Sequence, residues 1–360
     1  GAIYTTLDRV HRAPIGDSRI LIPVFPVDLN IGVPTNRVQS LAIYAVSSGG
    51  SSSFKFYGQR DMYTDENGML TIWLPSTDPG DVLQISVMMK DGGLTGMYYD
   101  YALAAPVMSG REAPSVLVLG NGTGTYAKQC LSYFPGSTAE GVEIDGKITQ
   151  LARDCFALPE AVKVTEYDGR AFLQATDERY DVILVDAYQD ITIPFQMSSV
   201  EFFRLVREHL KEDGVMVVNM NMRGEREGNI NQYLSDTIAS VFSEVWTVDV
   251  PYTTNRELLA SNNAQMIDVM AKNVEACADM PLREMLERVQ NGLSRYESGN
   301  YLMTDDRAPV ELLGMQVIDD LIRDEVAWYK MVYDEYGLDG ILGGGISGLH
   351  PHAGSRRKLS

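Results

Sequence analysis

Four apolar runs of the sequence each lead into residues that could bind a ligand or accept a proton. The run at 116–119 leads into a glycine-rich turn at 120–124, and later runs lead to Glu143, Asp168 and Asp186. Glycines let a ligand approach the backbone, and carboxylates accept hydrogen bonds from hydroxyl and amino groups. These residue types suit a site that binds a nucleoside and takes up a proton beside it.

The turn reads Gly120-Asn121-Gly122-Thr123-Gly124 and predicts a nucleotide site without a pyrophosphate. A dinucleotide fingerprint would need a third glycine at position 125, which is threonine, and no Walker lysine follows the turn. We expect the backbone of these five residues to contact the ligand, with the amides of the next helix directed at it.

Two acids after the turn indicate which nucleoside is bound. Glu143 follows the turn by about 20 residues, where a carboxylate accepts both hydroxyls of a ribose. Asp168, next to Gly169, stands where a carboxylate accepts the adenine amino group, with Phe172 beside the ring. Each acid alone is equally explained as a solvated carboxylate. Three features at three successive strand ends favour an S-adenosyl ligand.

The sequence DAYQD at 186–190 supplies the reactive group of the predicted site. Transfer from a sulfonium to an amine needs the amine neutral, whereas free alkylamines have pKa values of about 10. Asp186 at a strand tip could take that proton as a general base. Tyr188, Gln189 and Asp190 are predicted to bind the substrate. The competing explanation for Asp186 is a helix cap or a hydrogen bond within the loop.

The surrounding pattern predicts an α/β fold. From about residue 114 apolar strand-like runs alternate with amphipathic helix-like runs, which is typical of a doubly wound, mostly parallel sheet with helices on both faces. Ligands of such sheets bind at the carboxyl ends of the strands. Residues 1–95 hold short strand-like runs and are predicted to form a smaller β-rich module; 96–336 form the catalytic domain, and 337–360 a disordered tail.

The composition limits which binding partners and which cellular compartment we expect. The net charge of −19 opposes binding to nucleic acid and to anionic lipid, and it suits a cationic substrate. The 3 cysteines and 4 histidines form no ligand cluster, so we expect no metal and a reducing compartment, the cytoplasm. No apolar run approaches the roughly 18 residues of a membrane helix, although the chain begins at Gly1 and an upstream membrane segment of a fused protein fits equally well.

These motifs resemble the spermidine synthase family, the aminopropyltransferases that use decarboxylated S-adenosylmethionine. The likeness runs from about residue 94 to 330 and includes GNGTG, VEID, DGRAF and DVILVDA in the family's order, while LTGMYYDYALAAP and TDDRAPVE are similar to bacterial spermidine-synthase-like proteins, some fused to membrane segments. The resemblance implies the class I methyltransferase type of fold, donor binding by the 120–124 turn, Glu143 and Asp168, a catalytic Asp186, an acceptor contact from Tyr98, and a homodimer.

Three departures from the family pattern leave the donor and the acceptor open. Thr123 replaces an aspartate of the glycine turn that suits a donor without a carboxylate. The family's D-[ST]-x-D-P loop is replaced by residues 186–190, and Tyr98-Tyr99-Asp100 stands in place of Y-H-E. The co-substrate is therefore decarboxylated or ordinary S-adenosylmethionine, with no tightly bound cofactor.

Three hypotheses follow. The first is an aminopropyltransferase acting on a di- or polyamine. The second is a small-molecule methyltransferase on the same fold, and the third is a non-catalytic domain that binds an adenosyl ligand. The fold alone does not choose between them.

Overall fold

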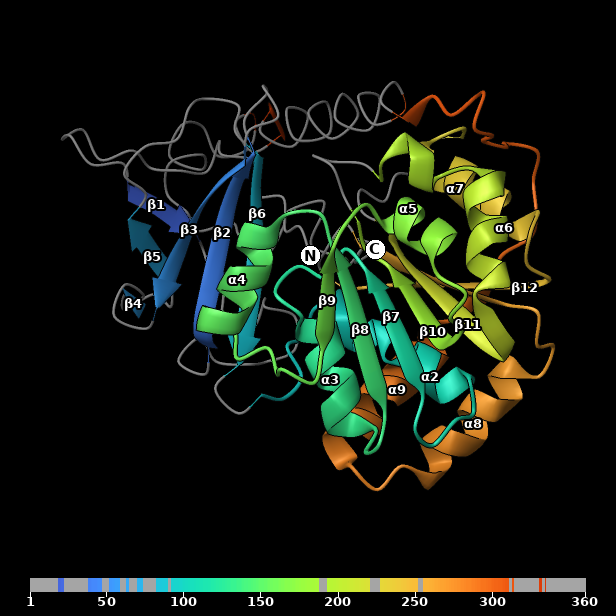
Figure 1. Cartoon of the computed structure of the whole chain (residues 1–360), viewed down its shortest axis with the longest axis horizontal. Coiled ribbons are helices and arrows are strands. Elements are labelled where there is room, and N and C mark those ends of the chain that lie inside the picture. Colours follow the sequence, from blue (N-terminus) through green and yellow to red (C-terminus); the bar gives the residue numbers. More distant parts are fainter. Residues whose placement is uncertain are drawn as a thin grey trace.

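The computed structural model describes residues 92–187, 193–220, 227–251 and 255–310, together with residues 313, 330, 331 and 334, and the backbone of six short strands before residue 90 (Figure 1). The predicted tail at 337–360 lies outside the described residues.

One mixed sheet organises the chain after residue 92. Among the described residues it has eight strands in the order β14-β12-β13-β11-β10-β7-β8-β9. Their bounds are β7 Ser115–Leu119, β8 Thr138–Glu143, β9 Lys163–Glu166, β10 Tyr180–Val185, β11 Leu210–Met220, β12 Glu244–Asp249, β13 Arg256–Ser261 and β14 Ser294–Arg295.

The sheet is doubly wound, as predicted. Strands β7 to β11 pair in parallel, whereas β13 runs antiparallel to both of its neighbours, β11 and β12, and β14 runs antiparallel to β12. The chain moves outward from β7 to β9 and then returns to place β10 on the other side of β7. This reversal puts the topological switch point between β7 and β10, where the carboxyl ends of strands leave room for a ligand.

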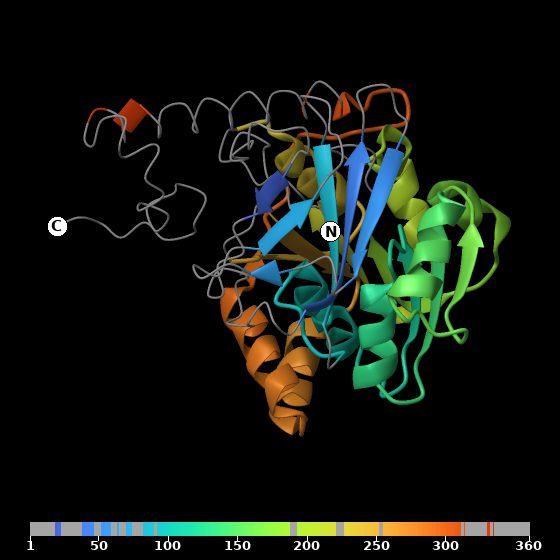
Figure 2. The same cartoon turned by 90° about the vertical axis from the view of Figure 1, so that its left-hand side faces the viewer.

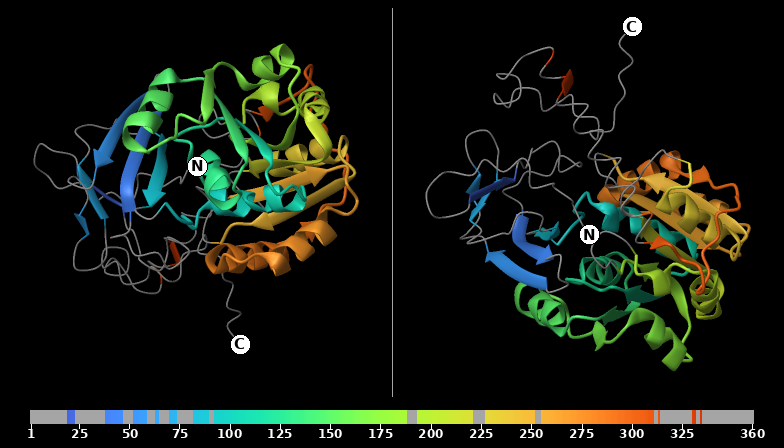
Figure 3. Two further views of the ribbon diagram at one scale, coloured as in Figure 1. Left: turned by 60° about the horizontal axis from the view of Figure 1, so that its bottom comes forward. Right: turned by 90° about the horizontal axis from the view of Figure 1, so that it is seen from above.

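Helices cover both faces of the sheet because its strands alternate apolar side chains between them (Figure 3). In β7, Val116 and Val118 pack in one buried cluster, and Leu117 and Leu119 pack in the other. The first cluster includes side chains of α1 Tyr98–Ala102, α2 Ala104–Met108, α3 Thr125–Tyr133, α4 Gly146–Cys155, α8 Met266–Ala276 and α9 Met280–Gly292. The second includes side chains of α5 Gly169–Ala175, η4 Phe195–Met197, α6 Val200–Glu208 and α7 Ile230–Ala239. No helix within the described ranges is both long enough and apolar enough to cross a membrane.

The strands before residue 90 form two small antiparallel sheets, which agrees with the β-rich character predicted for this part. One has the order β1-β5-β4 and the other β3-β2-β6 (Figure 2). The bounds are β1 Arg19–Ile22, β2 Val38–Val46, β3 Ser52–Gly58, β4 Tyr63–Thr64, β5 Leu70–Trp73 and β6 Val82–Met89. The predicted boundary at residue 95 stays a prediction.

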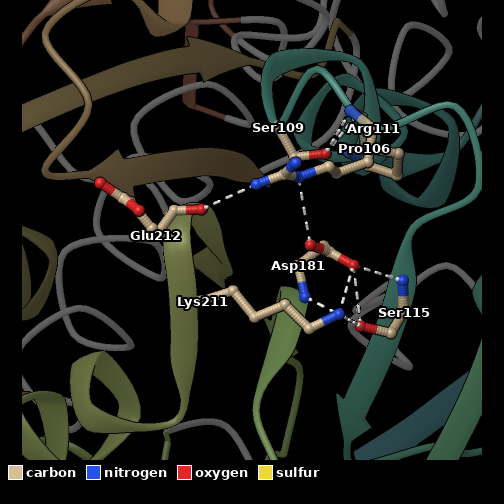
Figure 4. A network of polar contacts seen from close by, with 7 residues as sticks. All are labelled: Pro106, Ser109, Arg111, Ser115, Asp181, Lys211 and Glu212. Carbon is tan, nitrogen blue, oxygen red and sulfur yellow. Dashed lines mark hydrogen bonds and ion pairs between the residues drawn. The ribbon is translucent and has the colours of Figure 1, made fainter.

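A polar network lies at the end of the main sheet where the parallel strands begin (Figure 4). Asp181, near the start of β10, accepts hydrogen bonds from the backbone amide of Ser115 at 2.8 Å and from its hydroxyl at 2.9 Å. Lys211 lies 2.9 Å and Arg111 3.5 Å from the same carboxylate. Although burial alone would raise the pKa of Asp181, the Ser115 amide and Lys211 hold it below its ordinary value. The network joins the amino-terminal ends of β7, β10 and β11, opposite the carboxyl ends that carry the predicted site residues.

We expect Asp181→Ala to lower the free energy of unfolding by about 2 kcal/mol, because it leaves the Ser115 amide without its acceptor. Urea unfolding measures this, and Lys211→Ala, which removes a solvent-exposed partner, should cost less than about 1 kcal/mol. Since the folded-state pKa of Asp181 is depressed, its contribution is present above the ordinary carboxyl range and is lost as pH falls through the folded pKa. Equal stability of Asp181→Ala and the unaltered protein would contradict this role.

Candidate active site

The glycine turn connects β7 to α3 and is tied to the neighbouring strand β8. The amides of Gly120 and Asn121 both donate to the carbonyl of Val142, at 2.9 and 3.0 Å, and the amide of Gly124 donates to the carbonyl of Asn121 at 2.9 Å. The turn is thereby fixed at the carboxyl end of the sheet, which is where the sequence pattern predicts it.

Two positions of the turn hold glycine for different structural reasons. Gly120 has φ +86°, and a Cβ there would lie 2.5 Å from the carbonyl oxygen of Asp186, so the turn packs directly against the tip of β10. Gly122 has φ +52°, and a Cβ there would meet nothing within 4 Å. Gly120 therefore serves close packing, whereas Gly122 borders open space that a ligand can fill.

The two non-glycine residues of the turn point into the protein. Asn121 and Thr123 are 6% and 3% exposed. The Asn121 side chain lies over Gly141 of β8, where a Cβ would come within 2.6 Å of its Cγ. The turn therefore offers a ligand its backbone rather than these side chains, which agrees with a site that recognises the ligand through amides.

Glu143, at the end of β8, holds the turn in place. Its Oε2 accepts the amide of Gly122 at 2.8 Å, and its Oε1 accepts the amide of Asp145 at 3.1 Å. Burial raises the pKa of Glu143 above its ordinary value, and the two amides act in the opposite direction. Each carboxylate oxygen has a further lone pair, so binding to a ribose remains compatible with this second, structural role.

Asp168 caps the start of α5. Its Oδ1 accepts the amide of Ala171 at 2.8 Å, while its Oδ2 lies 3.5 Å from Nε2 of Gln196. The cap orients the carboxylate near the carboxyl end of β9 and leaves Oδ2 able to accept further hydrogen bonds. Gly169 beside it packs closely, since a Cβ there would lie 3.1 Å from Met197. Phe172 is partly buried and packs against the cluster under α5 and α6, and its place beside the adenine ring stays a prediction.

Two exposed apolar residues at this edge were missed by the sequence interpretation. Ile144 is 72% and Tyr167 is 51% exposed, and they directly follow the ends of β8 and β9. The amide of Tyr167 donates to the carbonyl of Glu143 at 3.1 Å, so the two strand tips lie side by side. An apolar residue immediately after an acidic strand end was the available signal.

Asp186 extends from the tip of β10 beside the glycine turn. Its amide donates to the carbonyl of Leu119 at 2.8 Å, which continues the pairing of β10 with β7. The hydroxyl of Tyr98 donates to Oδ2 at 2.5 Å, and Nδ2 of Asn219 donates to Oδ1 at 2.8 Å. Both carboxylate oxygens are thus oriented by fixed donors, and the side chain is partly exposed.

The surroundings of Asp186 shift its proton affinity. Burial raises the pKa of Asp186 above the ordinary carboxyl value, and the hydrogen bonds from Tyr98 and Asn219 act against this rise. The pKa of the Tyr98 hydroxyl is raised well above its usual value, first by burial and then by the charge of Asp186. Tyr98 therefore stays a proton donor to the carboxylate, and Asp186 is a carboxylate with raised basicity.

A second buried acid positions Tyr98. Asp100, two residues along α1, is fully buried and accepts hydrogen bonds from the amide and hydroxyl of Thr95, from the amide of Gly96 and from Nε2 of Gln129 on α3. These bonds fasten the start of α1 to α3. The hydroxyl of Tyr98 contacts Asp186, and the predicted contact of Tyr98 with the amine substrate stays a prediction.

Asn219 is a site residue that the sequence interpretation missed. It lies in β11, fully buried, and its Oδ1 accepts a hydrogen bond from Nδ2 of Asn255 at 2.8 Å. The signal in the sequence was a single amide within the apolar run VMVVNM at 215–220. Asn255 then orients Asn219, and Asn219 orients Asp186.

The strand order brings the four predicted motifs to one end of the sheet. Gly120 packs on Asp186, Gly122 is bonded to Glu143, and a Cβ on Gly169 would lie 3.5 Å from Leu119. Glu143, Asp168 and Asp186 thus surround the same end of β7. Tyr188, Gln189 and Asp190, predicted to bind the substrate, lie outside the described residues.

The TDDR motif at 304–307 contacts α5 next to this end of the sheet. Arg170 binds Asp305 through two hydrogen bonds of 2.7 and 2.6 Å and also donates to the carbonyl of Gln196 at 3.0 Å. Asp305 further accepts a hydrogen bond from Ser199 at 2.5 Å. These contacts hold the segment around Gln196 next to Asp168.

Known proteins are similar in sequence to this part of the chain. A family model described as the spermine/spermidine synthase domain matches residues 97–267. A protein of Bifidobacterium longum named probable polyamine aminopropyl transferase is 50% identical over 274 residues, which cover 71% of this chain and 61% of that protein. The polyamine aminopropyltransferase of Oceanobacillus iheyensis is 27% identical over 231 residues, 60% of this chain and 45% of that protein. The chain therefore spans less than two thirds of the length of either relative.

Solved structures with a similar arrangement include a probable spermidine synthase from Corynebacterium glutamicum, with 19% identity, a TM-score of 0.46, and coverage of 67% of this chain and 94% of that one. Spermidine synthase from Thermotoga maritima has 18% identity, a TM-score of 0.46, and coverage of 66% and 85%.

The strand order, with the antiparallel β13 between β11 and β12, is that of the class I methyltransferase type. The resemblance to the spermidine synthase family is confirmed by the family model and by the 50% identical relative. Residues 97–267 are similar to the spermine/spermidine synthase domain.

Proposed function

We propose that this chain transfers an aminopropyl group from decarboxylated S-adenosylmethionine to a di- or polyamine. The observation that carries the proposal is the placement of Asp186, a carboxylate with raised pKa whose two oxygens are oriented by Tyr98 and Asn219, directly against the glycine turn. The names of the relatives support the same activity.

The donor is proposed to bind along the tips of β7, β8 and β9. The open space at Gly122 admits the ligand beside the turn amides, Glu143 accepts the ribose hydroxyls, and Oδ2 of Asp168 accepts the adenine amino group. Ile144 and Tyr167, both exposed at adjacent tips, offer the adenine ring an apolar surface. The sulfonium end then points toward Asp186.

The transfer is a displacement at carbon. The neutral amine of the acceptor attacks the carbon next to the sulfonium, a nitrogen–carbon bond forms, and the carbon–sulfur bond breaks with its electron pair passing to sulfur to leave a neutral thioether. Asp186 takes the proton that the amine nitrogen loses. General-base assistance of this kind contributes about 100- to 10,000-fold, and fixing both reactants in line supplies a further acceleration.

A methyltransferase remains the second candidate because of Thr123. This residue stands where the family pattern has an acid, and its side chain is buried beside Thr125, with the two hydroxyl oxygens 3.4 Å apart. The turn therefore carries no carboxylate that would repel the carboxylate of ordinary S-adenosylmethionine. Tyr188, Gln189 and Asp190 are proposed acceptor contacts under either candidate.

Further parts of the prediction stay proposals: a homodimer, a location in the cytoplasm, and no nucleic acid partner. The three cysteines show no paired spacing in the sequence, which supports a reducing compartment. The net charge of −19 supports a cationic acceptor and opposes nucleic acid.

A product assay tests the proposed function. The chain is incubated with decarboxylated or ordinary S-adenosylmethionine and a panel of amines, and the products are identified by mass spectrometry. Aminopropylated amines are expected with the decarboxylated donor. Methylated amines from the ordinary donor would replace the proposal by the methyltransferase, and binding of either donor without turnover on any amine would leave an adenosyl-binding domain.

A further inference from the structure

One buried acid of the domain has no hydrogen-bond partner among the described residues. Glu257 on β13 is 0% exposed, and neither of its carboxylate oxygens is bonded. A buried polar group without a partner is costly, so such groups are rare in folded proteins and call for an explanation.

The other buried acids of the same domain show the contrast. Asp100 accepts four hydrogen bonds, Asp236 accepts three from Tyr296, Gly299 and Tyr301, and Glu143 accepts two. Each of these acids fastens a loop or a helix start. Glu257 fastens nothing among the described residues, so its carboxylate is not explained by the fold.

The register of the sheet places Glu257 beside the proposed catalytic acid. Asn219 of β11 is the direct partner of Glu257 in the antiparallel pairing of β11 with β13. Directly opposed residues point to the same face with Cβ atoms about 4.5–5.5 Å apart. Since Nδ2 of Asn219 donates to Asp186 at 2.8 Å, Glu257 shares the face of the sheet on which Asp186 lies.

Among the described residues, the charged groups that act on Glu257 are acidic. Burial raises the pKa of Glu257 well above its ordinary value, and the charge of Asp186 raises it further. The titratable groups of the described residues that act on Glu257 or are acted on by it are Asp186 on β10 and Tyr126 on α3, whose hydroxyl donates to the carbonyl of Ala102. Among these groups none is a cation that could neutralise Glu257.

We propose that Glu257 is an anionic subsite for a second nitrogen of the acceptor, so that the site selects diamines and polyamines over monoamines. The inference rests on the proposed function and deepens it. Because Asp186 is partly exposed and Glu257 is fully buried, an acceptor that enters past Asp186 meets Glu257 as the deeper acid. An ammonium group there supplies the hydrogen-bond donors and the positive charge that the described residues do not supply.

Proton release accompanies binding in this arrangement. In the empty site the raised pKa favours the neutral carboxylic acid, and a bound ammonium favours the carboxylate. The proton that Glu257 loses passes to the buffer when the acceptor binds. The site therefore discriminates between acceptors by their charge.

The test uses two amines of equal length, 1,4-diaminobutane and 1-aminobutane, with the intact protein and its Glu257→Gln variant. The unaltered protein is expected to prefer the diamine in kcat/KM by about tenfold to hundredfold, the effect of one hydrogen bond to a buried charge. Glu257→Gln should lose most of this preference through a higher KM for the diamine, while KM for the donor stays within about twofold. Glu257→Asp, which keeps the charge, should retain part of the preference.

Two controls keep the result interpretable. Glu244→Gln changes a glutamate of β12 that is bonded to Arg295 away from Asp186, and it should leave the preference unchanged. The melting temperature of Glu257→Gln without ligand is expected to stay within about 2 °C of that of the unaltered protein, because a neutral buried acid without a partner is replaced by a neutral amide without a partner. A preference for the diamine that is unchanged in Glu257→Gln overturns the inference and leaves the proposed function standing.

Calorimetry separates this failure from that of the proposed function. Binding of 1,4-diaminobutane is titrated in buffers of different ionisation enthalpy, which reports protons released. If the unaltered protein transfers nothing but binds the diamine with proton release that Glu257→Gln lacks, the subsite stands and the proposed function fails. If the diamine does not bind, or binds without proton release, the inference is overturned.

Discussion

Asp186→Asn is expected to lower the rate of aminopropyl transfer by about 100- to 10,000-fold, because it removes the group that accepts the amine proton. Asparagine fits the same space. Its oxygen can face Nδ2 of Asn219, and its amide can donate to the Tyr98 hydroxyl, which accepts as readily as it donates. Donor affinity, measured by isothermal titration, should therefore stay within about twofold of the unaltered protein.

The matched control for this substitution is Asp279→Asn. Asp279 caps α9 by accepting the amide of Leu282 at 2.9 Å, and asparagine caps helices about as well as aspartate. It should change neither the rate nor donor affinity. If Asp186→Asn transferred the aminopropyl group at the rate of the control, Asp186 would not be the general base, and the domain would position its substrates without one.

Gly120→Ala is expected to have the largest effect on stability, a loss of about 3 kcal/mol or more. Its methyl group would lie 2.5 Å from the carbonyl oxygen of Asp186 and 2.7 Å from Cα of Ala187, and φ of +86° is itself unfavourable for alanine. The turn and the tip of β10 would have to separate. A fall in melting temperature of about 6–12 °C, followed by circular dichroism, should accompany the loss.

Gly122→Ala provides the comparison. Nothing lies within 4 Å of a Cβ at Gly122, so the fold should lose only about 1–2 kcal/mol from the positive φ. The added methyl group occupies the space assigned to the donor, and donor affinity should fall by about tenfold or more. Unchanged donor binding by Gly122→Ala would show that the turn does not hold the donor.

The sequence was sufficient to predict the sheet and the positions of its acidic tips. Alternating apolar strands and amphipathic helices from residue 114 predicted the parallel sheet. The residues at the carboxyl ends of β7, β8 and β10 lie where the pattern put them, because the direction of a parallel strand fixes which end carries them. The position of Asp186 at the tip of β10 was therefore predictable from the sequence.

The roles of individual acids were harder to predict because they depend on partners distant in sequence. Glu143 is used to hold Gly122, and Asp168 is used as a cap for α5, neither of which excludes a ligand. Asn219 and Glu257 were missed altogether. Their place beside Asp186 follows from the antiparallel register of β11 and β13, and a strand's register is not visible in its own residues.

The reversed direction of β13 has a consequence for how such a domain can change its preference. The parallel strands present their last residues at the active edge, where Glu143 and Asp186 are tied to the fold and to the glycine turn. β13 presents its first residues there instead, Glu257 among them. Evolutionary substitutions at the first residues of β13 can therefore change the proposed acceptor site. The parallel strands that form the proposed donor site need not change with them.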